Sequence, residues 1–509
     1  MSSVFTIENR YRPSYFALLI YLLLLKAVVM GLIIAAYNIH LSPDEAQYWM
    51  WSQQLDWGYY SKPPAIAWQI WMTTLVFGHQ EFGVRVGSII IGFLLVLTVY
   101  HLAQSCRLSE RVSFWAAVVM AFSPIGIFFS FAATTDPGAT LFLTLAIAEI
   151  ARGLEEEQQP RYALAGVWIL LGALYKWTTY ILWPITFVMM LFHPKLRKLS
   201  IIWGVLISLL ALLPSVYWNA SHDWATFKHV GGNFYHPGRT GNVIDFLASQ
   251  IGIVSPILFV LLVVSFFYLK KPSLVYLSLF PFVILFYFVT SFFKKMQPNW
   301  GDYLYPPAMV LIAWVALEKI RLGRLWLHLG IWLSIIGTFV ALSIPWLQEH
   351  NVFSQHQISY KANPFRQSMG WERLGPALTQ AGYCATADTF LFGDRYQTTS
   401  LLSFYAPEDN RTYFFNLNQQ RKNQFSYGIR MEDCEVGKTG YFVVIENAKP
   451  ESLHWYETCY PEKLHPYFEQ VTHVGNYPLF TAYGRNVKYA MVFRCEHYLG
   501  TCPKDPEKY

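Results

Sequence analysis

Long apolar runs constrain the fold of this chain more than any other feature. Eleven stretches are apolar over a length close to the roughly 20 residues that a helix needs to cross a bilayer. Only 14% of the 509 residues are charged, against about 25% in a typical soluble domain. The sequence therefore predicts a polytopic α-helical membrane protein with 11–13 spans. The eleven runs lie at roughly 15–38, 83–104, 111–130, 137–153, 162–176, 178–193, 199–218, 251–270, 273–292, 303–320 and 324–345.

Basic residues in alternate loops predict how these spans are oriented. Lys and Arg are enriched in short cytoplasmic loops, and this rule accounts for the net charge of +6 without a nucleic-acid partner. The acidic stretch 42–64, residues 134–137, the segment 294–302 and the region after about residue 346 are then expected on the outer side. The basic loops hold Arg10 and Arg12; Arg107 and Arg111; Arg152 and Arg161; Lys195, Arg197 and Lys198; Lys270 and Lys271; Lys319, Arg321 and Arg324.

The composition divides the chain into two parts. Residues 1–345 form the predicted transmembrane domain, with outer loops at 39–82 and 219–250. Residues 65–77 are apolar but too short to span, and they predict a helix that lies in the outer interface. After residue 346 short strand-like and helix-like pieces alternate, which predicts a C-terminal soluble α/β domain over 346–509. The expected strands there are 389–393, 440–446 and 487–494, and the expected helices are 396–405 and 450–460.

The six cysteines show no tight zinc-type spacing. Cys106 falls in a predicted cytoplasmic turn, whereas the other five lie in the C-terminal segment. If that segment faces an oxidising compartment, disulfides are expected there. Cys495 paired with Cys502 is the first pairing to test.

Asp44 and Glu45 lead the candidate residues for chemistry. They follow the first apolar run, at the outer end of the predicted span. A carboxylate at the mouth of a membrane cavity can act as a general base or bind a divalent cation. The alternative is a solvated acid or a helix cap after Ser42-Pro43. Lys62, Asp136 and Lys176 fall on the same predicted face, which favours a functional site.

Lys62 precedes Pro63-Pro64 and is the first candidate to bind a phosphate. Its alternative role is to lift its ammonium to water at the membrane boundary. Asp136 could start a helix or face a cationic partner, because an unpaired aspartate within the bilayer costs about 2.5–3.5 kcal/mol on insertion scales. Lys176, Arg85 and Lys294 are further candidate phosphate contacts, and lipid headgroups are the alternative partner for Lys294.

Histidines cluster in the outer loop 219–250, at His222, His229 and His236. Their spacing matches no tight metal motif, so a polar loop is the favoured interpretation and a metal site is left open. No glycine-rich nucleotide loop or nucleophile elbow is present in the sequence. An outward-facing site without a nucleotide would need a donor that is already in the membrane.

Several motifs resemble a known family. SPDEAQYWMW, GYYSKPPAIAWQ, EFGVRVGS and TTDPG are similar to membrane glycosyltransferases of the GT-C fold, a group that includes protein O-mannosyltransferases and lipid A aminoarabinose transferases. The closer likeness is to the bacterial glycosyltransferase 39/83-type branch. The resemblance covers the first half of the chain and continues loosely through QPNWGDYLYPPA and GDRYQTTSLLSFY.

The resemblance implies sugar transfer from a polyprenyl-phosphate donor to a lipid, glycan or protein acceptor at the periplasmic face of a bacterial inner membrane. A single displacement would invert the anomeric centre. The alternatives are a lipid-linked sugar flippase or transporter, and a non-catalytic scaffold. The family pattern implies active-site roles for Asp44 and Asp136 and substrate contacts from Lys62, Tyr48 and Tyr59. Glu45 is a further catalytic candidate and Tyr60 a further candidate substrate contact.

Two positions depart from the aminoarabinose transferases. This chain has Gln47 where those enzymes have arginine. It has Ser61 where they have a glutamate that contacts a metal. Both departures count against aminoarabinose as the sugar, and the second counts against a metal at that point. Apart from a possible divalent cation, the resemblance implies no cofactor.

Overall fold

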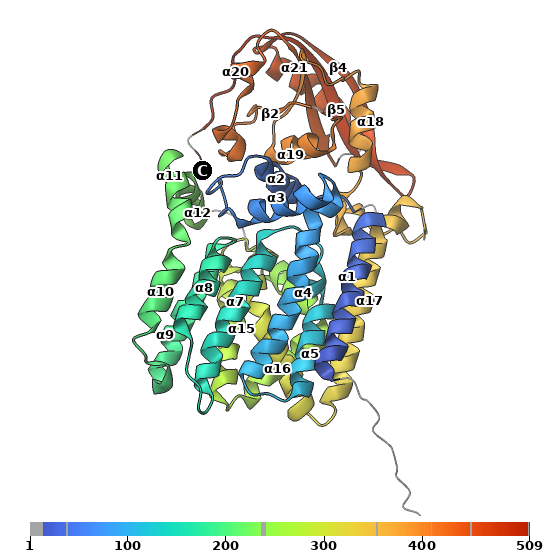
Figure 1. The fold of residues 1–509 in the computed structure, drawn as a ribbon. Helices are drawn as coiled ribbons and strands as arrows, with labels where there is room; N and C mark the ends of the chain where they lie inside the picture. Colours follow the sequence, from blue (N-terminus) through green and yellow to red (C-terminus); the bar gives the residue numbers. More distant parts are fainter. Residues whose placement is uncertain are drawn as a thin grey trace, which may run out of the picture.

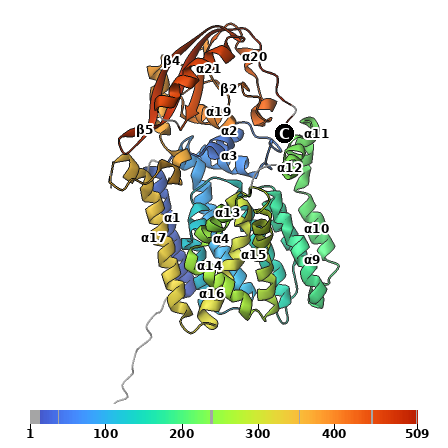
Figure 2. The same ribbon diagram turned by 180° about the vertical axis from the view of Figure 1, so that it is seen from behind.

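The computed structural model describes residues 14–36, 39–235, 241–352, 355–408, 410–447, 450–506 and 508. A bundle of long helices forms one end of the molecule, a mixed sheet with flanking helices forms the other, and the short helices α2 and α3 lie between them (Figure 1). Figure 2 shows the same three layers from behind, with α17 beside α1 at one edge of the bundle. The predicted division into a helical domain and a C-terminal α/β domain corresponds to these layers.

Helices occupy all eleven predicted apolar runs. Six described helices are long and apolar enough to cross a membrane, or seven if one bent pair counts as a single span. The bundle helices are α1 (Tyr15–Ala36), α4 (Glu81–Ser105), α5 (Glu110–Phe122), α6 (Pro124–Phe128), α7 (Thr135–Ala151), α8 (Tyr162–Ala173), α9 (Leu182–Phe192), α10 (Ile201–Leu209), α11 (Leu212–Ser221), α13 (Val243–Val254), α14 (Pro256–Ser265), α15 (Pro272–Thr290), α16 (Tyr305–Glu318) and α17 (Gly323–Glu349). The multi-pass membrane architecture is confirmed, whereas the total of 11–13 spans stays a prediction.

Two of the predicted spans are interrupted at a proline. The run 251–270 was expected to be continuous, but α13 and α14 meet at 93°. Ser255 lies between them with φ at +91°, and Pro256 starts the next helix. The run 111–130 is likewise interrupted at Ser123-Pro124, where α5 ends and α6 begins. Both breaks occur at a Ser-Pro step, because proline cannot donate the backbone hydrogen bond that would continue a helix.

The C-terminal domain is built on a five-stranded sheet with the strand order β2-β1-β3-β5-β4. The strands are β1 (Thr389–Gly393), β2 (Thr412–Phe414), β3 (Thr439–Glu446), β4 (Phe468–Ala482) and β5 (Arg485–Tyr498), and the helices are α18 (Leu374–Gln380), α19 (Tyr396–Tyr405), α20 (Met431–Cys434) and α21 (Leu453–Leu464). β1 is parallel to β2 and β3, while β5 is antiparallel to β3 and β4. The predicted strands and helices of this domain are present; β4, the longest strand, was not predicted.

One hydrophobic core joins the C-terminal domain to the outer loop of the bundle. It combines Leu391 and Val443 of the sheet and Leu402 of α19 with Trp51 of α2 and Ile70 of α3. The helices concerned are α2 (Pro43–Gln53) and α3 (Ala65–Phe77), the latter being the interfacial helix predicted for 65–77. Figure 1 shows α19 lying against α2. Because this core is shared, the sheet domain holds the outer loop in place.

The predicted Cys495–Cys502 disulfide is wrong. All six cysteines lie in the described part of the chain, and all are free thiols. Cys495 is a buried residue of β5 and belongs to the second hydrophobic core of the domain. The Cys502 Sγ instead contacts the Glu432 carboxylate at 3.0 Å.

Candidate functional site

Helix α2 sets the position of Asp44. Ser42 caps this helix through a reciprocal box in which its Oγ accepts from the Glu45 N–H at 3.3 Å and its own N–H donates to Glu45 Oε2 at 2.9 Å. Pro43 occupies the first turn, where its missing N–H costs nothing. Asp44 and Glu45 are therefore fixed in the first turn but point to different surroundings.

Glu45 lies in a closed ion pair with Arg85. The carboxylate is only 2% exposed, and the Arg85 Nε donates to Glu45 Oε1 at 2.8 Å. Arg85 is fully buried and also donates to the carbonyls of Ile39 and His40 at 2.6 and 2.7 Å. The backbone N–H of Ala133 donates to the same Glu45 oxygen at 3.0 Å. This pair ties together α2, α4 and the segment before α7.

Lys62 sits on the turn that links α2 to α3. The Lys62 carbonyl accepts a hydrogen bond from the Tyr59 N–H at 3.1 Å, and Pro63-Pro64 then lead directly into α3. The Tyr59 ring stacks on Trp51 with centroids 4.6 Å apart. Its hydroxyl donates to the Trp51 carbonyl at 3.1 Å. The aromatic residues between the acidic pair and Lys62 thus shape the loop that presents the lysine.

Asp136 and Lys176 form a second ion pair, with the Lys176 Nζ 2.6 Å from Asp136 Oδ1. Asp136 lies in the first turn of α7, and Lys176 follows α8. The side chains are 7% and 15% exposed, respectively. The cationic partner that the sequence required for a membrane-level aspartate is therefore present.

A polar cavity of about 410 Å³ lies where the bundle, the outer loop and the C-terminal domain meet. It brings together Asp44, Lys62, Asp136 and Lys176, which come from separate segments of the sequence. The lining residues are Asp44, Gln47, Tyr48, Tyr60, Ser61, Lys62, Thr134, Thr135, Asp136, Lys176, His229, Asn299, Trp300, Tyr396, Gln397, Gln420, Arg421 and Asn423. We refer to this space as the polar cavity.

Four predicted site residues do not line the polar cavity. Glu45 and Arg85 are occupied with each other, as described above. Tyr59 faces a neighbouring space of about 540 Å³ between the outer loop and the C-terminal domain. Lys294 follows α15, and Asn299 and Trp300 of the same loop reach the cavity instead. For Glu45 and Tyr59, burial in the α2–α3 region accounts for the difference, because neighbouring residues there face opposite sides.

Five lining residues of the C-terminal domain were not predicted from the sequence: Tyr396, Gln397, Gln420, Arg421 and Asn423. Tyr396 begins α19, and its hydroxyl donates to Asp44 Oδ1 at 3.4 Å. Arg421 contacts the His229 ring with its Nη1 3.1 Å from Nδ1. The only sequence signal for this group was the loose resemblance in GDRYQTTSLLSFY, which contains Tyr396 and Gln397. Gln420 to Asn423 lay in a stretch without any motif.

Burial and like charges shift the ionisation of the cavity residues. Burial raises the pKa of Asp44, although Lys62 partly counteracts this effect. Burial lowers the pKa of Lys62, and the nearby Lys176 lowers it further. Burial, followed by the charges of Arg421 and Lys62, lowers the pKa of His229 to about 4. At neutral pH, His229 is therefore uncharged and can accept a hydrogen bond from Arg421.

The structure describes no metal centre. Among the described residues no three of His, Cys, Asp and Glu lie close enough together to hold a metal ion. His222 and His229 belong to separate surroundings, since His222 stacks on Trp218 with ring centroids 4.1 Å apart and His229 lines the polar cavity. His236 lies outside the described residues.

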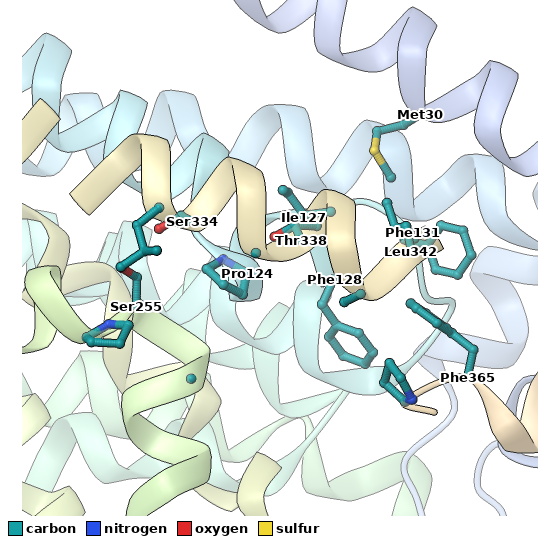
Figure 3. A pocket seen from close by; sticks show the side chains of 16 residues that line it. Met30, Pro124, Ile127, Phe128, Phe131, Ser255, Ser334, Thr338, Leu342 and Phe365 are labelled. Atoms are coloured by element: carbon teal, nitrogen blue, oxygen red, sulfur yellow. The ribbon is translucent and has the colours of Figure 1, made fainter. Parts of the chain in front are cut away.

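A second cavity of about 420 Å³ is almost wholly apolar and lies within the bundle. Figure 3 shows Met30, Phe131 and Phe365 at one end of it, and Ser255 and Ser334 at the other. Close to this region Lys26 of α1 donates from its Nζ to the Gly126 carbonyl at 3.0 Å and to Ser130 Oγ at 2.9 Å. Lys26, in the middle of α1, thus provides hydrogen bonds to a carbonyl and a hydroxyl group beside α6.

Comparisons with known proteins show that this chain shares its fold with a solved membrane protein, ArnT. Residues 61–218 match the family model described as dolichyl-phosphate-mannose-protein mannosyltransferase. Crystal structures of ArnT from Cupriavidus metallidurans superpose over 92% of this chain and 97% of ArnT, with a TM-score of 0.62 for the apo state and 0.60 for the state bound to undecaprenyl phosphate. The identity is 16% in both cases, so this likeness concerns the fold alone. The resemblance to GT-C glycosyltransferases is confirmed at that level.

Two relatives carry informative names. Lipid A galacturonosyltransferase RgtD of Rhizobium johnstonii is 28% identical over 295 residues, which cover 54% of this chain and 60% of that protein. An undecaprenyl phosphate-alpha-4-amino-4-deoxy-L-arabinose arabinosyl transferase of Pseudomonas aeruginosa is 33% identical over 142 residues, or 26% of each chain. The chain thus matches about three fifths of the first relative and one quarter of the second.

Proposed function

We propose that this protein is a membrane glycosyltransferase that moves a sugar from a polyprenyl-phosphate donor to a lipid, glycan or protein acceptor. One observation carries the proposal: the polar cavity places two lysines and two aspartates together at the junction of an apolar bundle and a C-terminal domain. A donor that carries a lipid tail, a phosphate and a sugar suits this junction, because the bundle is apolar and the cavity is polar and charged. The name of one relative, lipid A galacturonosyltransferase RgtD, supports lipid A as the acceptor.

The chemistry follows from the charges in the polar cavity. The leaving group is a lipid phosphate, which is stable as an anion and needs a cation more than an acid. Lys62 is the proposed phosphate contact, and Lys176 supports it from the Asp136 pair. The departing bond leaves positive charge on the sugar carbon, and the carboxylates of Asp44 and Asp136 stabilise that charge.

Asp44 takes a second role if the acceptor is a hydroxyl. The acceptor oxygen then attacks the anomeric carbon as the bond to the lipid phosphate breaks, and Asp44 accepts the hydroxyl proton. Tyr48 and Tyr60 line the same cavity and are the proposed sugar contacts. A single displacement inverts the anomeric centre. If the acceptor is a phosphate, it attacks as an anion and no base is required.

Glu45 and Arg85 have a positioning role in this proposal. Their closed pair holds Asp44 and the segment before α7 at a constant separation, so that Asp136 reaches the cavity. Tyr59 has the same kind of role, because its ring and hydroxyl shape the Lys62 turn. Lys294 does not line the polar cavity, although Asn299 and Trp300 of the same loop do. A contact between Lys294 and the lipid phosphate therefore stays a prediction from the sequence.

The orientation is part of the proposal. Alternating basic loops indicate that the polar cavity and the C-terminal domain face the periplasm of a bacterial inner membrane. In Figure 1 the loops between α5 and α4, between α7 and α8 and between α16 and α17 all lie at the end of the bundle opposite the sheet domain. Labelling of single introduced cysteines with a membrane-impermeant reagent in intact spheroplasts measures this orientation directly.

Purified protein in lipid nanodiscs, supplied with a polyprenyl-phosphate sugar and lipid A, tests the activity. The expected products are glycosylated lipid A and free polyprenyl phosphate, measured by mass spectrometry. Release of neither product would overturn the proposal. If the donor instead crosses a proteoliposome membrane with its sugar still attached, the transporter alternative is correct.

A further inference from the structure

The cavity wall supplied by the C-terminal domain carries a cation that the proposed reaction does not use. Arg421 lines the polar cavity, and its guanidinium contacts the neutral His229 ring at 3.1 Å. Within the described part of the chain, Arg421 forms no ion pair with a carboxylate. Lys176, by contrast, is already paired with Asp136 at 2.6 Å. Arg421 therefore keeps a charge and several N–H donors for a ligand.

The backbone around Arg421 is held rigidly. The Asn416 side chain closes the preceding turn, donating to the Gln420 carbonyl at 2.9 Å and accepting from the Gln420 N–H at 2.8 Å. Asn423 follows, and its side chain accepts from the Phe425 N–H at 2.9 Å. The N–H between them, that of Lys422, donates to the Lys508 carbonyl at 2.8 Å. A guanidinium presented by so constrained a loop suits a directional contact with an oxyanion.

The architecture indicates which part of the donor faces Arg421. The C-terminal domain covers the end of the helix bundle, with α2 and α3 between them (Figure 2). A polyprenyl tail has to leave the cavity toward the bundle, so its phosphate lies on the Lys62 and Lys176 side. The sugar is attached beyond the phosphate and reaches the wall formed by Tyr396, Gln397 and Arg421. In this arrangement of the donor, Arg421 would lie beside the transferred sugar.

The two named relatives transfer sugars of opposite charge, namely a galacturonosyl group and an amino-arabinosyl group. An ammonium on the sugar would have to compete with Lys176 for Asp136 and with the charge of Lys62 for Asp44. The neighbouring Gln47 and Ser61 are uncharged. The wall therefore disfavours a cationic sugar and suits an anionic one.

From this arrangement we infer that the transferred sugar bears a carboxylate, as in a hexuronic acid, and that Arg421 binds it. The inference rests on the proposed function. A planar guanidinium pairs with a carboxylate through two parallel N–H···O bonds. The neutral His229 accepts one guanidinium N–H and so orients the remaining donors toward the sugar. Arg421 is then a specificity-determining residue rather than part of the bond-breaking machinery.

The test compares three donors in the full-length protein: polyprenyl phosphate linked to galacturonic acid, to galactose, and to 4-amino-4-deoxyarabinose. We expect the wild type to prefer the uronosyl donor. Arg421→Gln should lower kcat/KM for that donor by roughly ten- to hundred-fold, which is the effect of losing a charged hydrogen-bonded pair. The same variant should lower transfer of galactose far less, because galactose has no carboxylate for Arg421 to bind. Lys422→Gln removes the adjacent charge, which does not line the cavity, and serves as the matched control.

The outcomes separate this inference from the proposed function. Equal losses with the uronosyl and galactosyl donors would mean that Arg421 binds the shared phosphate, and would overturn the inference. A wild-type preference for galactose or for the amino sugar would overturn it while leaving glycosyl transfer intact. An absence of transfer from all three donors would overturn both. Arg421→Lys keeps the positive charge but lacks the two parallel N–H donors of the guanidinium. It should therefore transfer the uronosyl group faster than Arg421→Gln but more slowly than the wild type.

Discussion

Asp44 and Glu45 are neighbours in the sequence, yet they lie in opposite surroundings. Glu45 is closed off in a pair with Arg85, with its oxygens occupied by Arg85, Ser42 and Ala133. Asp44 opens onto the polar cavity and, among the described residues, accepts only the long 3.4 Å hydrogen bond from Tyr396. The difference shows that two identical charges one residue apart can be divided between stabilising the fold and facing a substrate.

Asp44→Asn and Lys62→Ala test the residues that face the polar cavity, and both should impair sugar transfer. Each is expected to lower transfer by about 10²–10⁴-fold, the usual contribution of a positioned acid–base or charged group. The melting temperature should stay close to that of the wild type, because neither side chain is in a closed pair. Initial rates in nanodiscs and thermal unfolding measure the two effects. Asp388→Asn and Lys198→Ala, both on exposed surface, are the matched controls.

Glu45→Gln tests the buried ion pair with Arg85 and should destabilise the fold. It leaves the Arg85 charge buried without a carboxylate, which typically costs about 3–5 kcal/mol of folding stability. The expected result is a strongly lowered melting temperature or loss of the folded protein from detergent extracts. If Glu45→Gln folds normally and abolishes transfer, Glu45 belongs with Asp44 in the reaction, and its positioning role is refuted.

His40 provides a third case, in which a charged cluster joins the two domains. Its Nδ1 lies 2.8 Å from Glu81 Oε1 at the start of α4, and its Nε2 lies 2.6 Å from Glu372 Oε2 of the C-terminal domain. Burial by itself lowers the pKa of His40, but hydrogen bonds to Glu372 and Glu81 outweigh it and raise the pKa to about 9. Tyr405 donates to the same Glu81 oxygen at 2.5 Å.

The stability contributed by His40 should depend on pH. A folded-state pKa above the unfolded value of about 6.5 means that the contribution is complete below pH 6.5 and is lost as the pH rises through about 9. The loss is on the order of 2 kcal/mol, since Glu372 is partly exposed and screened. Melting temperatures from pH 6 to 9.5 should fall more steeply for the wild type than for His40→Gln. Parallel curves would refute the charged state of His40.

Tyr396→Phe should have the smallest effect. It removes the Tyr396 hydroxyl that contacts Asp44, and a single contact at 3.4 Å contributes roughly 0.5–1.5 kcal/mol at most. A decrease in kcat of a few-fold is expected, with a shift of the acidic limb of the pH–rate profile to higher pH, because the hydrogen bond from Tyr396 lowers the pKa of Asp44. An unchanged profile would indicate that Tyr396 only packs against α2.

The sequence was informative wherever a local pattern carried the signal. Apolar run length predicted the helices, and the break at Ser255 was missed because hydropathy does not register a φ of +91°. Asp44, Lys62, Asp136 and Lys176 stood out as charged residues beside apolar runs, and the structure places them on one cavity. Their roles in transfer stay predictions.

By itself the sequence determined that this chain is a multi-pass helical protein with a C-terminal α/β domain, because span length and strand patterning are local properties. Only the tertiary structure decided which charges face each other. It separated Glu45 from Asp44, paired Lys176 with Asp136, and brought Arg421 to a site that begins 377 residues earlier in the chain, at Asp44. Such choices depend on how the shared core seats the sheet domain on the outer loop, and no local pattern encodes that contact.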